Sequence, residues 1–225
     1  MEIKGLRDSV TENLRARIIT GRLAPGQRLN EGELCEMFNV SRSPLREALL
    51  ILEREDLVVN IPRKGTYVSP MSEENVQRIY QVMDMVEMYA LDHLEKEGIT
   101  QIPEVKSAVD QCTIFEMPPR DDWKDLLAYR KMLASFHSKL VETLQNPVII
   151  AFYKRTSSNL ARYQYLQLFK MGSGKGMIKD HKQIIGRIEK GDYKEARDLL
   201  KAHIETSFRY KIDALKARGR ERGAA

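Results

Sequence analysis

The hydrophobic pattern of the chain changes at about residue 70, and this change limits the possible folds more than any other feature of the sequence. Residues 1–70 hold short apolar segments separated by turn-forming residues, whereas apolar residues in 72–217 recur every three or four positions over long stretches. We therefore expect a mainly α-helical protein, in which a small N-terminal domain with a few strands precedes a C-terminal antiparallel all-α bundle.

The boundary between the two parts falls near Pro70. This proline ends the preceding segment, and Ser72 is placed to cap a helix whose first turn carries Glu73 and Glu74. The expected domains are residues 1–70 and 71–217, followed by a basic tail at 218–225 that we expect to be disordered. The expected helices of the second domain cover about 73–97, 104–116, 121–144, 147–170, 176–190 and 193–217.

The composition indicates neither a membrane protein nor a secreted one. The chain has 225 residues, is 42% hydrophobic and 31% charged, and contains no apolar run near the roughly 20 residues that span a bilayer. Its N-terminus lacks the basic and then apolar arrangement of a secretory signal, and Cys35 and Cys112 lie far apart. We expect a cytoplasmic protein. The net charge of +5 fits an anionic partner without requiring one.

Three short helices are predicted before residue 55. We expect Ser43 to cap the third helix with Pro44 at its first position, and four apolar residues form one buried stripe along it. The stripe consists of Leu45, Ala48, Leu49 and Leu52. With that stripe buried, Arg42, Ser43 and Arg46 lie at the exposed start of the helix, where a recognition helix meets base edges. The pattern predicts a helix-turn-helix.

The segment LVVNIPRKGTYVSP predicts a β-hairpin in which Gly65 supplies a permissive turn conformation. Its tip carries Arg63 and Lys64, so the hairpin is expected to be a wing whose cations engage phosphates beside a groove. The alternative is a solvated basic turn on a structural domain. The order and spacing of the helices and the hairpin favour DNA binding.

These first 70 residues resemble the winged helix of the GntR superfamily of bacterial transcription regulators. The similarity runs through IITGRLAPGQRLNEGELCEMFNVSRSPLREALLILEREDLV and a G-x-x-V wing, and SRSPLREAL is a specific part of it. The resemblance implies that the residues at the DNA include Ser41, Arg42, Ser43, Arg46 and Gly65. One type of family member has a further DNA-contacting arginine where this chain has Gly32.

The helical remainder resembles the FCD effector domain of the FadR-like branch, and its length is similar to that of the VanR-like subgroup. This resemblance implies a homodimer on a double-stranded operator with an inverted repeat, each monomer contacting one half-site. It also implies that a small-molecule effector binds the helical domain and changes operator affinity. Repression relieved by the ligand is the usual behaviour of such proteins.

Three histidines face the interior of the predicted bundle. His137, His181 and His203 each belong to the apolar stripe of a different helix. A lone inward histidine is more often a hydrogen-bonded core residue, but three imidazoles together suit zinc or nickel with an open position for water or an effector. The FCD resemblance implies a divalent metal held by an Asp-x-x-x-His pair on one helix and two later histidines. The three histidines of that pattern match His137, His181 and His203.

Two positions depart from the FCD pattern. Leu133 stands where the metal-binding aspartate is expected, and Met83 stands where many relatives carry an arginine near the ligand. Both changes replace a charged residue by an apolar one. We therefore expect a pocket that suits a larger or less charged effector than the small carboxylates common in the family.

The fourth helix of the bundle supplies possible anchors for an effector. Arg155, Asn159 and Arg162 lie at i, i+4 and i+7, so they share one helical face that could hold an acidic group. The alternative is a solvated face, which is the more common place for arginine.

Two other classes of function compete with a regulator. An enzyme with a metal in the helical bundle is one, but no histidine follows a glutamate by three residues, and no Gly-rich phosphate loop or nucleophile elbow occurs. An architectural DNA-binding protein without an effector is the other. The inward histidines and the size of the bundle favour the ligand-controlled regulator over both.

Overall fold

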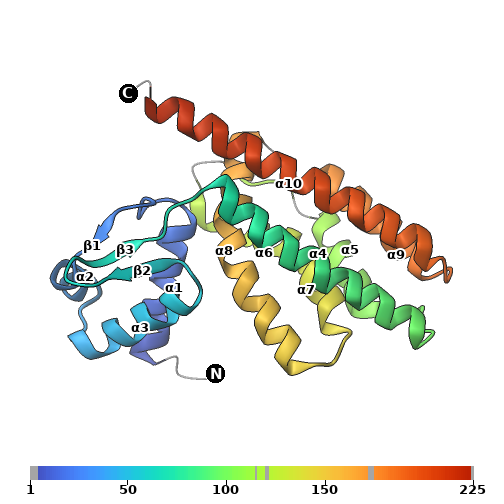
Figure 1. Cartoon of the computed structure of the whole chain (residues 1–225), viewed down its shortest axis with the longest axis horizontal. Helices are drawn as coiled ribbons and strands as arrows, with labels where there is room; N and C mark the ends of the chain where they lie inside the picture. The colour runs from blue at the N-terminus through green and yellow to red at the C-terminus, as the bar shows by residue number, and fades with distance from the viewer. Residues whose placement is uncertain (1–4, 115, 120–121, 172–174, 224–225) are drawn as a thin grey trace. The chain divides into compact units, whose positions relative to one another are not determined.

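The computed structural model describes residues 5–114, 116–119, 122–171 and 175–223 (Figure 1). The chain divides into two compact units, Met1–Met71 and Ser72–Ala225. None of the described helices is both long enough and apolar enough to cross a bilayer.

The described part of the first unit combines three helices with a three-stranded antiparallel sheet (Figure 1). Its elements are α1 Leu6–Ile19, β1 Arg28–Leu29, α2 Glu31–Phe38, α3 Arg42–Arg54, β2 Val58–Ile61 and β3 Gly65–Val68. The central strand is β3, with β1 on one side and β2 on the other. The expected hairpin is formed by β2 and β3, in which Val58 lies opposite Val68 and Ile61 opposite Gly65.

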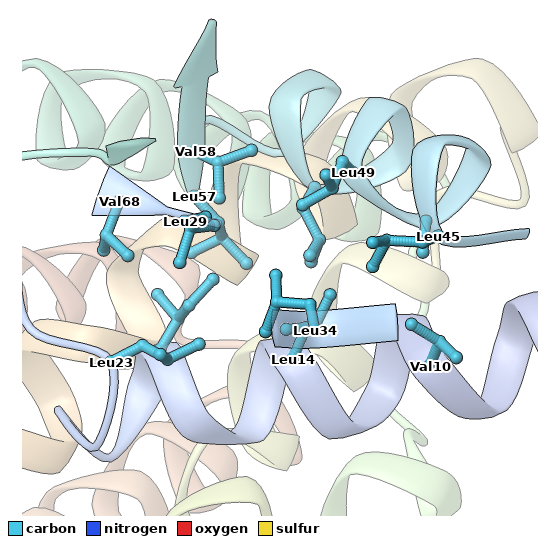
Figure 2. Close-up of a cluster of buried hydrophobic side chains, with 13 residues drawn as sticks. Val10, Leu14, Leu23, Leu29, Leu34, Leu45, Leu49, Leu57, Val58 and Val68 are labelled. Atoms are coloured by element: carbon cyan, nitrogen blue, oxygen red, sulfur yellow. The ribbon is translucent and has the colours of Figure 1, made fainter. Parts of the chain in front are cut away.

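The core of the first unit lies between α1, α3 and the sheet (Figure 2). Leu14 on α1 and Leu45 and Leu52 on α3 are fully buried, so the predicted apolar stripe of α3 is confirmed. Figure 2 shows Leu45 and Leu49 directed from α3 toward Leu14. Fully burying a leucine contributes about 1.5–3 kcal/mol, so these contacts fix which face of α3 remains exposed.

The start of α3 differs from the expectation by two residues. The helix begins at Arg42, Ser41 occupies the N-cap position without a side-chain bond, and Ser43 lies in the first turn. The prediction of Ser43 as the cap is therefore wrong. Pro44 is the third residue of the helix, two positions further in than expected. It fits there because the first four backbone N–H groups of a helix have no intrahelical acceptor to lose.

The second unit is a bundle of helices, as predicted (Figure 1). Its described helices are α4 Glu73–Lys96, α5 Pro103–Ile114, α6 Trp123–Leu133, α7 Ser135–Glu142, α8 Pro147–Met171, α9 Lys175–Ile188 and α10 Tyr193–Gly223. The last helix packs against α4, α8 and α9, and α4 also packs against α7 and α8. Figure 1 shows α4 and α10 running in opposite directions.

Two helix boundaries in the second unit differ from the expectation. The single helix expected over 121–144 is broken by a turn at Ala134 into α6 and α7, and residue 121 itself lies outside the described residues. The final helix α10 continues to Gly223, through a segment in which we expected a disordered tail. The break at Ala134 matters for the site, because Leu133 and His137 belong to different helices.

The second unit begins at a residue that is hydrogen-bonded to α8. Ser72 caps α4 as predicted, since its hydroxyl accepts a bond of 3.1 Å from Asn75 N. The backbone N–H of Ser72 donates to the hydroxyl of Tyr163 at 3.1 Å, and that hydroxyl donates to Ser72 O at 3.2 Å. The Asn75 amide donates to the same hydroxyl at 3.3 Å. Tyr163 is fully buried, so these bonds fix the first turn of α4 to α8.

Candidate DNA-binding surface and histidine cluster

The polar residues at the start of α3 form an exposed face of the first unit. Arg42, Ser43 and Arg46 are exposed, and so is Ser41 just before the helix. Their orientation follows from the leucine stripe, because burying Leu45 turns the opposite side of the first turn toward solvent. The structure thus places the predicted base-contacting side chains where a groove could reach them.

The tip of the wing carries the two predicted cations. Arg63 and Lys64 are exposed and lie between β2 and β3. Arg63 has φ of 64° and Gly65 has φ of 103°. The second value is rarely adopted by residues with a side chain, so Gly65 is required where the hairpin turns into β3.

A hollow of about 650 Å³ lies between the wing and the starts of α2 and α3, and we refer to it as the arginine hollow. It is lined by Arg28, Leu29, Asn30, Glu31, Gly32, Glu33, Arg42, Arg46, Gly65 and Thr66. Arg46 Nε donates to Glu31 Oε2 at 2.9 Å, and the pair is largely exposed. The hollow therefore brings the predicted residues of α3 next to the wing glycine.

Arg28 is a residue of this surface that the sequence interpretation missed. It belongs to β1, where it pairs with Tyr67 of β3 while Leu29 pairs with Thr66. A Cβ added at Gly65 would lie 3.7 Å from Arg28 Nε, so the guanidinium packs directly over the glycine. A strand of two residues is too short to show the alternation of apolar and polar residues by which strands are predicted. The only sequence signal for Arg28 was that a basic residue follows the turn Pro25–Gly26.

The three inward histidines meet in the second unit. His137 on α7, His181 on α9 and His203 on α10 each offer a nitrogen, and these three atoms lie within 4.8 Å of one another. His181 Nε2 and His203 Nε2 are 3.1 Å apart. The ring of Phe136 stacks on His181 with centroids 4.1 Å apart, which fixes the orientation of that imidazole. The structure therefore confirms that the three predicted histidines converge.

Two carboxylates that the sequence interpretation missed hold these histidines from outside. Glu87 Oε2 lies 2.7 Å from His137 Nδ1, and Asp180 Oδ2 lies 3.1 Å from His203 Nδ1. The other oxygen of Glu87 accepts a bond of 2.6 Å from the hydroxyl of Tyr153. Each carboxylate occupies the Nδ1 side of its imidazole and leaves the Nε2 side available.

The environment of the cluster favours neutral imidazoles. Burial lowers the pKa of His181 well below its ordinary value, and the neighbouring His137 and His203 lower it further. Burial and then His137 lower the pKa of His203 to about 4, against the opposing effect of Asp180. Both rings are therefore neutral at physiological pH, which is the form that binds metal ions.

The remaining predicted effector residues divide into a buried group and an exposed one. Met83 and Leu133 are buried, as expected for residues that line an interior site. Asn159 and Arg162 are also buried, so the solvated-face alternative is wrong for them. Arg155 is exposed and its guanidinium lies over the ring of Phe152. The three residues therefore do not share one environment, because α8 is mostly exposed around Arg155 and mostly buried after Ser158.

A second buried polar group lies on α10 two turns beyond His203. Lys211 Nζ donates to Gln167 Oε1 and to Ser207 Oγ, both at 2.7 Å. The hydroxyls of Ser207 and Tyr80 lie 3.0 Å apart. Burial lowers the pKa of Lys211 to about 7, because the interior disfavours its charged form.

Comparison with known families assigns both units. Residues 6–68 match the bacterial regulatory proteins of the gntR family, and residues 78–206 match the FCD domain. The chain belongs to the GntR family. The GntR match makes the first unit a DNA-binding domain, and the FCD match makes the second an effector-binding domain. These matches are to regulators of transcription and not to enzymes.

Individual GntR regulators resemble the chain over most of its length. An uncharacterized HTH-type regulator from an unstable DNA locus of Streptomyces ambofaciens is 27% identical over 90% of this chain and 83% of its own. The gluconate operon transcriptional repressor of Bacillus licheniformis is 26% identical over 87% of this chain and 79% of its own. The crystal structure of a GntR regulator from Rhodococcus sp. RHA1 aligns with a TM-score of 0.72 and 25% identity, covering 92% and 98%.

Proposed function

We propose that this GntR regulator is a repressor that binds its operator through the arginine hollow and the wing. Ser41, Arg42, Ser43 and Arg46 face the major groove in this proposal. Arg63 and Lys64 engage the phosphate backbone, and Gly65 allows the wing to approach it closely. The GntR match of residues 6–68 supports the assignment of this surface.

The observation that carries the proposal is the convergence of three arginines on one hollow. Arg28, Arg42 and Arg46 line it together with the N-terminal ends of α2 and α3. The positive ends of two helix dipoles and three guanidinium groups attract the negatively charged DNA. Glu31 holds Arg46 in the free protein through an exposed pair, and because such pairs contribute little, DNA can displace it.

Arg28 fills a role that the second helix leaves open. The family position with a DNA-contacting arginine is Gly32 here, and Gly32 lines the arginine hollow. Arg28 reaches the same hollow from β1, where it packs over Gly65. We therefore include Arg28 among the DNA contacts, at a place where operator preference is expected to differ from that of relatives with the helical arginine.

The protein is proposed to act as a homodimer on an inverted repeat. The described part of the chain holds one recognition helix, α3, which can contact one half-site. Two copies related by a twofold axis then require a palindromic operator. This part of the proposal rests on the FCD resemblance and on the general symmetry of helix-turn-helix regulators.

A zinc or nickel ion is proposed at His137, His181 and His203, and the donor set fits one. Nitrogens of a tetrahedral zinc site with Zn–N distances near 2.0 Å lie about 3.3 Å apart. The two Nε2 atoms at 3.1 Å, and the limit of 4.8 Å for all three residues, are close to that spacing. When bound, the ion supplies positive charge and an open position for an oxygen atom of an effector.

The effector is proposed to bind next to the histidines. Met83 lies one turn from Glu87 on α4, and Leu133 lies close in sequence to His137, so the neighbouring surface is apolar. Asn159 and Arg162 are buried on α8, and Asn159 Oδ1 has no hydrogen bond in the described part of the chain. Met83 and Leu133 favour a ligand larger or less charged than a small carboxylate, whereas Asn159 and Arg162 could hold an acidic group on that ligand. Arg155 is not part of this proposal because it is exposed.

Ligand binding in the helical unit is proposed to change the fit of the dimer to its two half-sites. A coupling of about 1 to 3 kcal/mol changes operator affinity by about 5- to 150-fold. Operator affinity with and without a candidate effector tests the coupling. An unchanged affinity at saturation would exclude that compound.

Replacing Arg46 by alanine tests the DNA-binding surface. Operator fragments are first selected from a random DNA pool, and the recovered sequences are expected to contain an inverted repeat. The Arg46→Ala variant is expected to lose about 1 to 3 kcal/mol of binding free energy, measured by fluorescence anisotropy. Arg54→Ala is the matched control, because Arg54 is exposed at the opposite end of α3. Equal affinities of the two variants would contradict the assignment.

A further inference from the structure

Glu87 is a buried carboxylate whose two oxygens are both hydrogen-bonded. It lies on α4 with 1% of its surface exposed. Oε2 is 2.7 Å from His137 Nδ1, and Oε1 accepts from the Tyr153 hydroxyl at 2.6 Å. A buried carboxylate is costly unless its partners compensate for the lost water. The side chain is therefore held in one orientation between α7 and α8.

We infer that Glu87 is the positioning residue of the histidine site and supplies the negative charge that position 133 lacks. This inference rests on the proposed metal site. Because Glu87 Oε2 occupies the Nδ1 side of His137, Nε2 is the nitrogen left to bind a metal ion. Hydrogen bonding to a carboxylate also makes the ring a stronger ligand.

The same arrangement recurs at His203, so the site has two outer carboxylates. Asp180 Oδ2 lies 3.1 Å from His203 Nδ1, which leaves His203 Nε2 directed at His181. The two negative charges balance a divalent cation, although neither carboxylate coordinates it directly. A carboxylate from α4 thus compensates for Leu133 on α6, although the two helices are far apart in sequence.

The two carboxylates differ in burial, and this difference makes the inference testable. The Glu87 side chain is 1% exposed, whereas that of Asp180 is 42% exposed. Water screens the charge of Asp180 but not that of Glu87. We therefore expect Glu87 to contribute more to metal affinity than Asp180 does.

The alternative role for Glu87 is to fix α4 to α7 and α8 without any influence on a metal. Tyr153→Phe separates the two roles, because it removes the bond to α8 and leaves His137 untouched. A packing role predicts that Tyr153→Phe and Glu87→Gln lower the stability of the metal-free protein and leave the affinity for metal unchanged.

The test is the zinc affinity of the full-length protein, measured by competition with a chromophoric chelator. Glu87→Gln keeps the volume and removes the charge, and it is expected to weaken zinc binding by about 10- to 100-fold. Asp180→Asn is the matched control and is expected to lose less. His137→Ala provides the reference for a site without one of its ligands.

The possible results distinguish the role of Glu87 from the existence of the metal site. Wild-type affinity in Glu87→Gln would overturn the inference and leave the metal site standing. Failure of the wild type to bind zinc or nickel would overturn the metal site and the inference with it. If Glu87→Gln does not fold, Glu87→Asp decides, because the shorter side chain keeps the charge but is expected not to reach His137 Nδ1. Equal affinity in that variant would also overturn the inference.

Discussion

Among the described lysines, Lys211 alone is fully buried, and this burial lowers the pKa of its amino group. Its acceptors, Gln167 and Ser207, are neutral, so they compensate only in part for the lost hydration of a charge. The folded protein releases this proton at about pH 7, whereas the unfolded chain keeps it to about pH 10.5. Between these values the unfolded state binds more protons, and the contribution of Lys211 to stability rises with pH.

Replacing Lys211 by methionine should remove this pH dependence. The difference in unfolding free energy between the wild type and Lys211→Met is expected to shift in favour of the wild type by on the order of 3 kcal/mol from pH 7 to pH 10. Below pH 7 the difference should be constant, since both states are protonated there. Urea denaturation of both proteins across this range measures it. A difference that is independent of pH would mean that the amino group is solvated.

The histidines could be predicted from the sequence, but their carboxylate partners could not. His137, His181 and His203 repeat the period of their helices, so their inward direction follows from local pattern. The partners are separated by 50 residues for Glu87 and by 23 for Asp180, and no local period connects such positions. Burial of a glutamate is also rare, so the sequence favours an exposed position for it.

The wing shows how a single backbone conformation can fix an element. Gly65 begins β3 with φ of 103°, and the guanidinium of Arg28 packs over it from β1. A Cβ at this position would meet Arg28 at an ordinary contact distance of 3.7 Å, so space is available. The restriction therefore comes from the backbone angle rather than from crowding.

Replacing Gly65 by alanine is expected to destabilise the first unit by about 1 to 3 kcal/mol and to weaken operator binding, because alanine strains this conformation. Gly186→Ala is the matched control. Gly186 lies inside α9, and a Cβ there would meet nothing within 4 Å, so the same substitution should stabilise by about 0.5–1 kcal/mol. Urea denaturation followed by circular dichroism compares the two. Equal effects would contradict the strain argument.

The helices with a long apolar repeat could be predicted from the sequence. The elements that depend on only a few residues could not. The helices of the second unit follow from their apolar period, and α3 follows from its leucine stripe. The strand β1 has only two residues and exists because Arg28 and Leu29 pair with β3. The turn at Ala134 is a similar case, because Ala134 itself has helical propensity and nothing local to it signals a break.

The unfolding of the two units can be followed separately. The sequence contains one tryptophan, Trp123, which lies at the start of α6 in the second unit. Its fluorescence therefore reports the unfolding of the FCD bundle alone, whereas circular dichroism reports helices of both units.

Zinc at 100 times its dissociation constant should stabilise the unit that binds it by about 2.7 kcal/mol. The transition seen by Trp123 fluorescence is expected to move to higher temperature, while the unfolding of the first unit stays unchanged. The His137→Ala variant should not respond. An equal shift of both transitions would indicate that the two units unfold as one.

The hydrogen bonds of Tyr163 have a consequence for the path of the polypeptide. Ser72 is the first residue of the FCD bundle, and both its N–H and its carbonyl are bonded to a hydroxyl carried by α8. The same helix contributes Asn159 and Arg162 to the proposed effector site. A ligand that rotates or slides α8 must either break these bonds or carry the first turn of α4 with it, and thereby move the point at which the chain arrives from its DNA-binding unit.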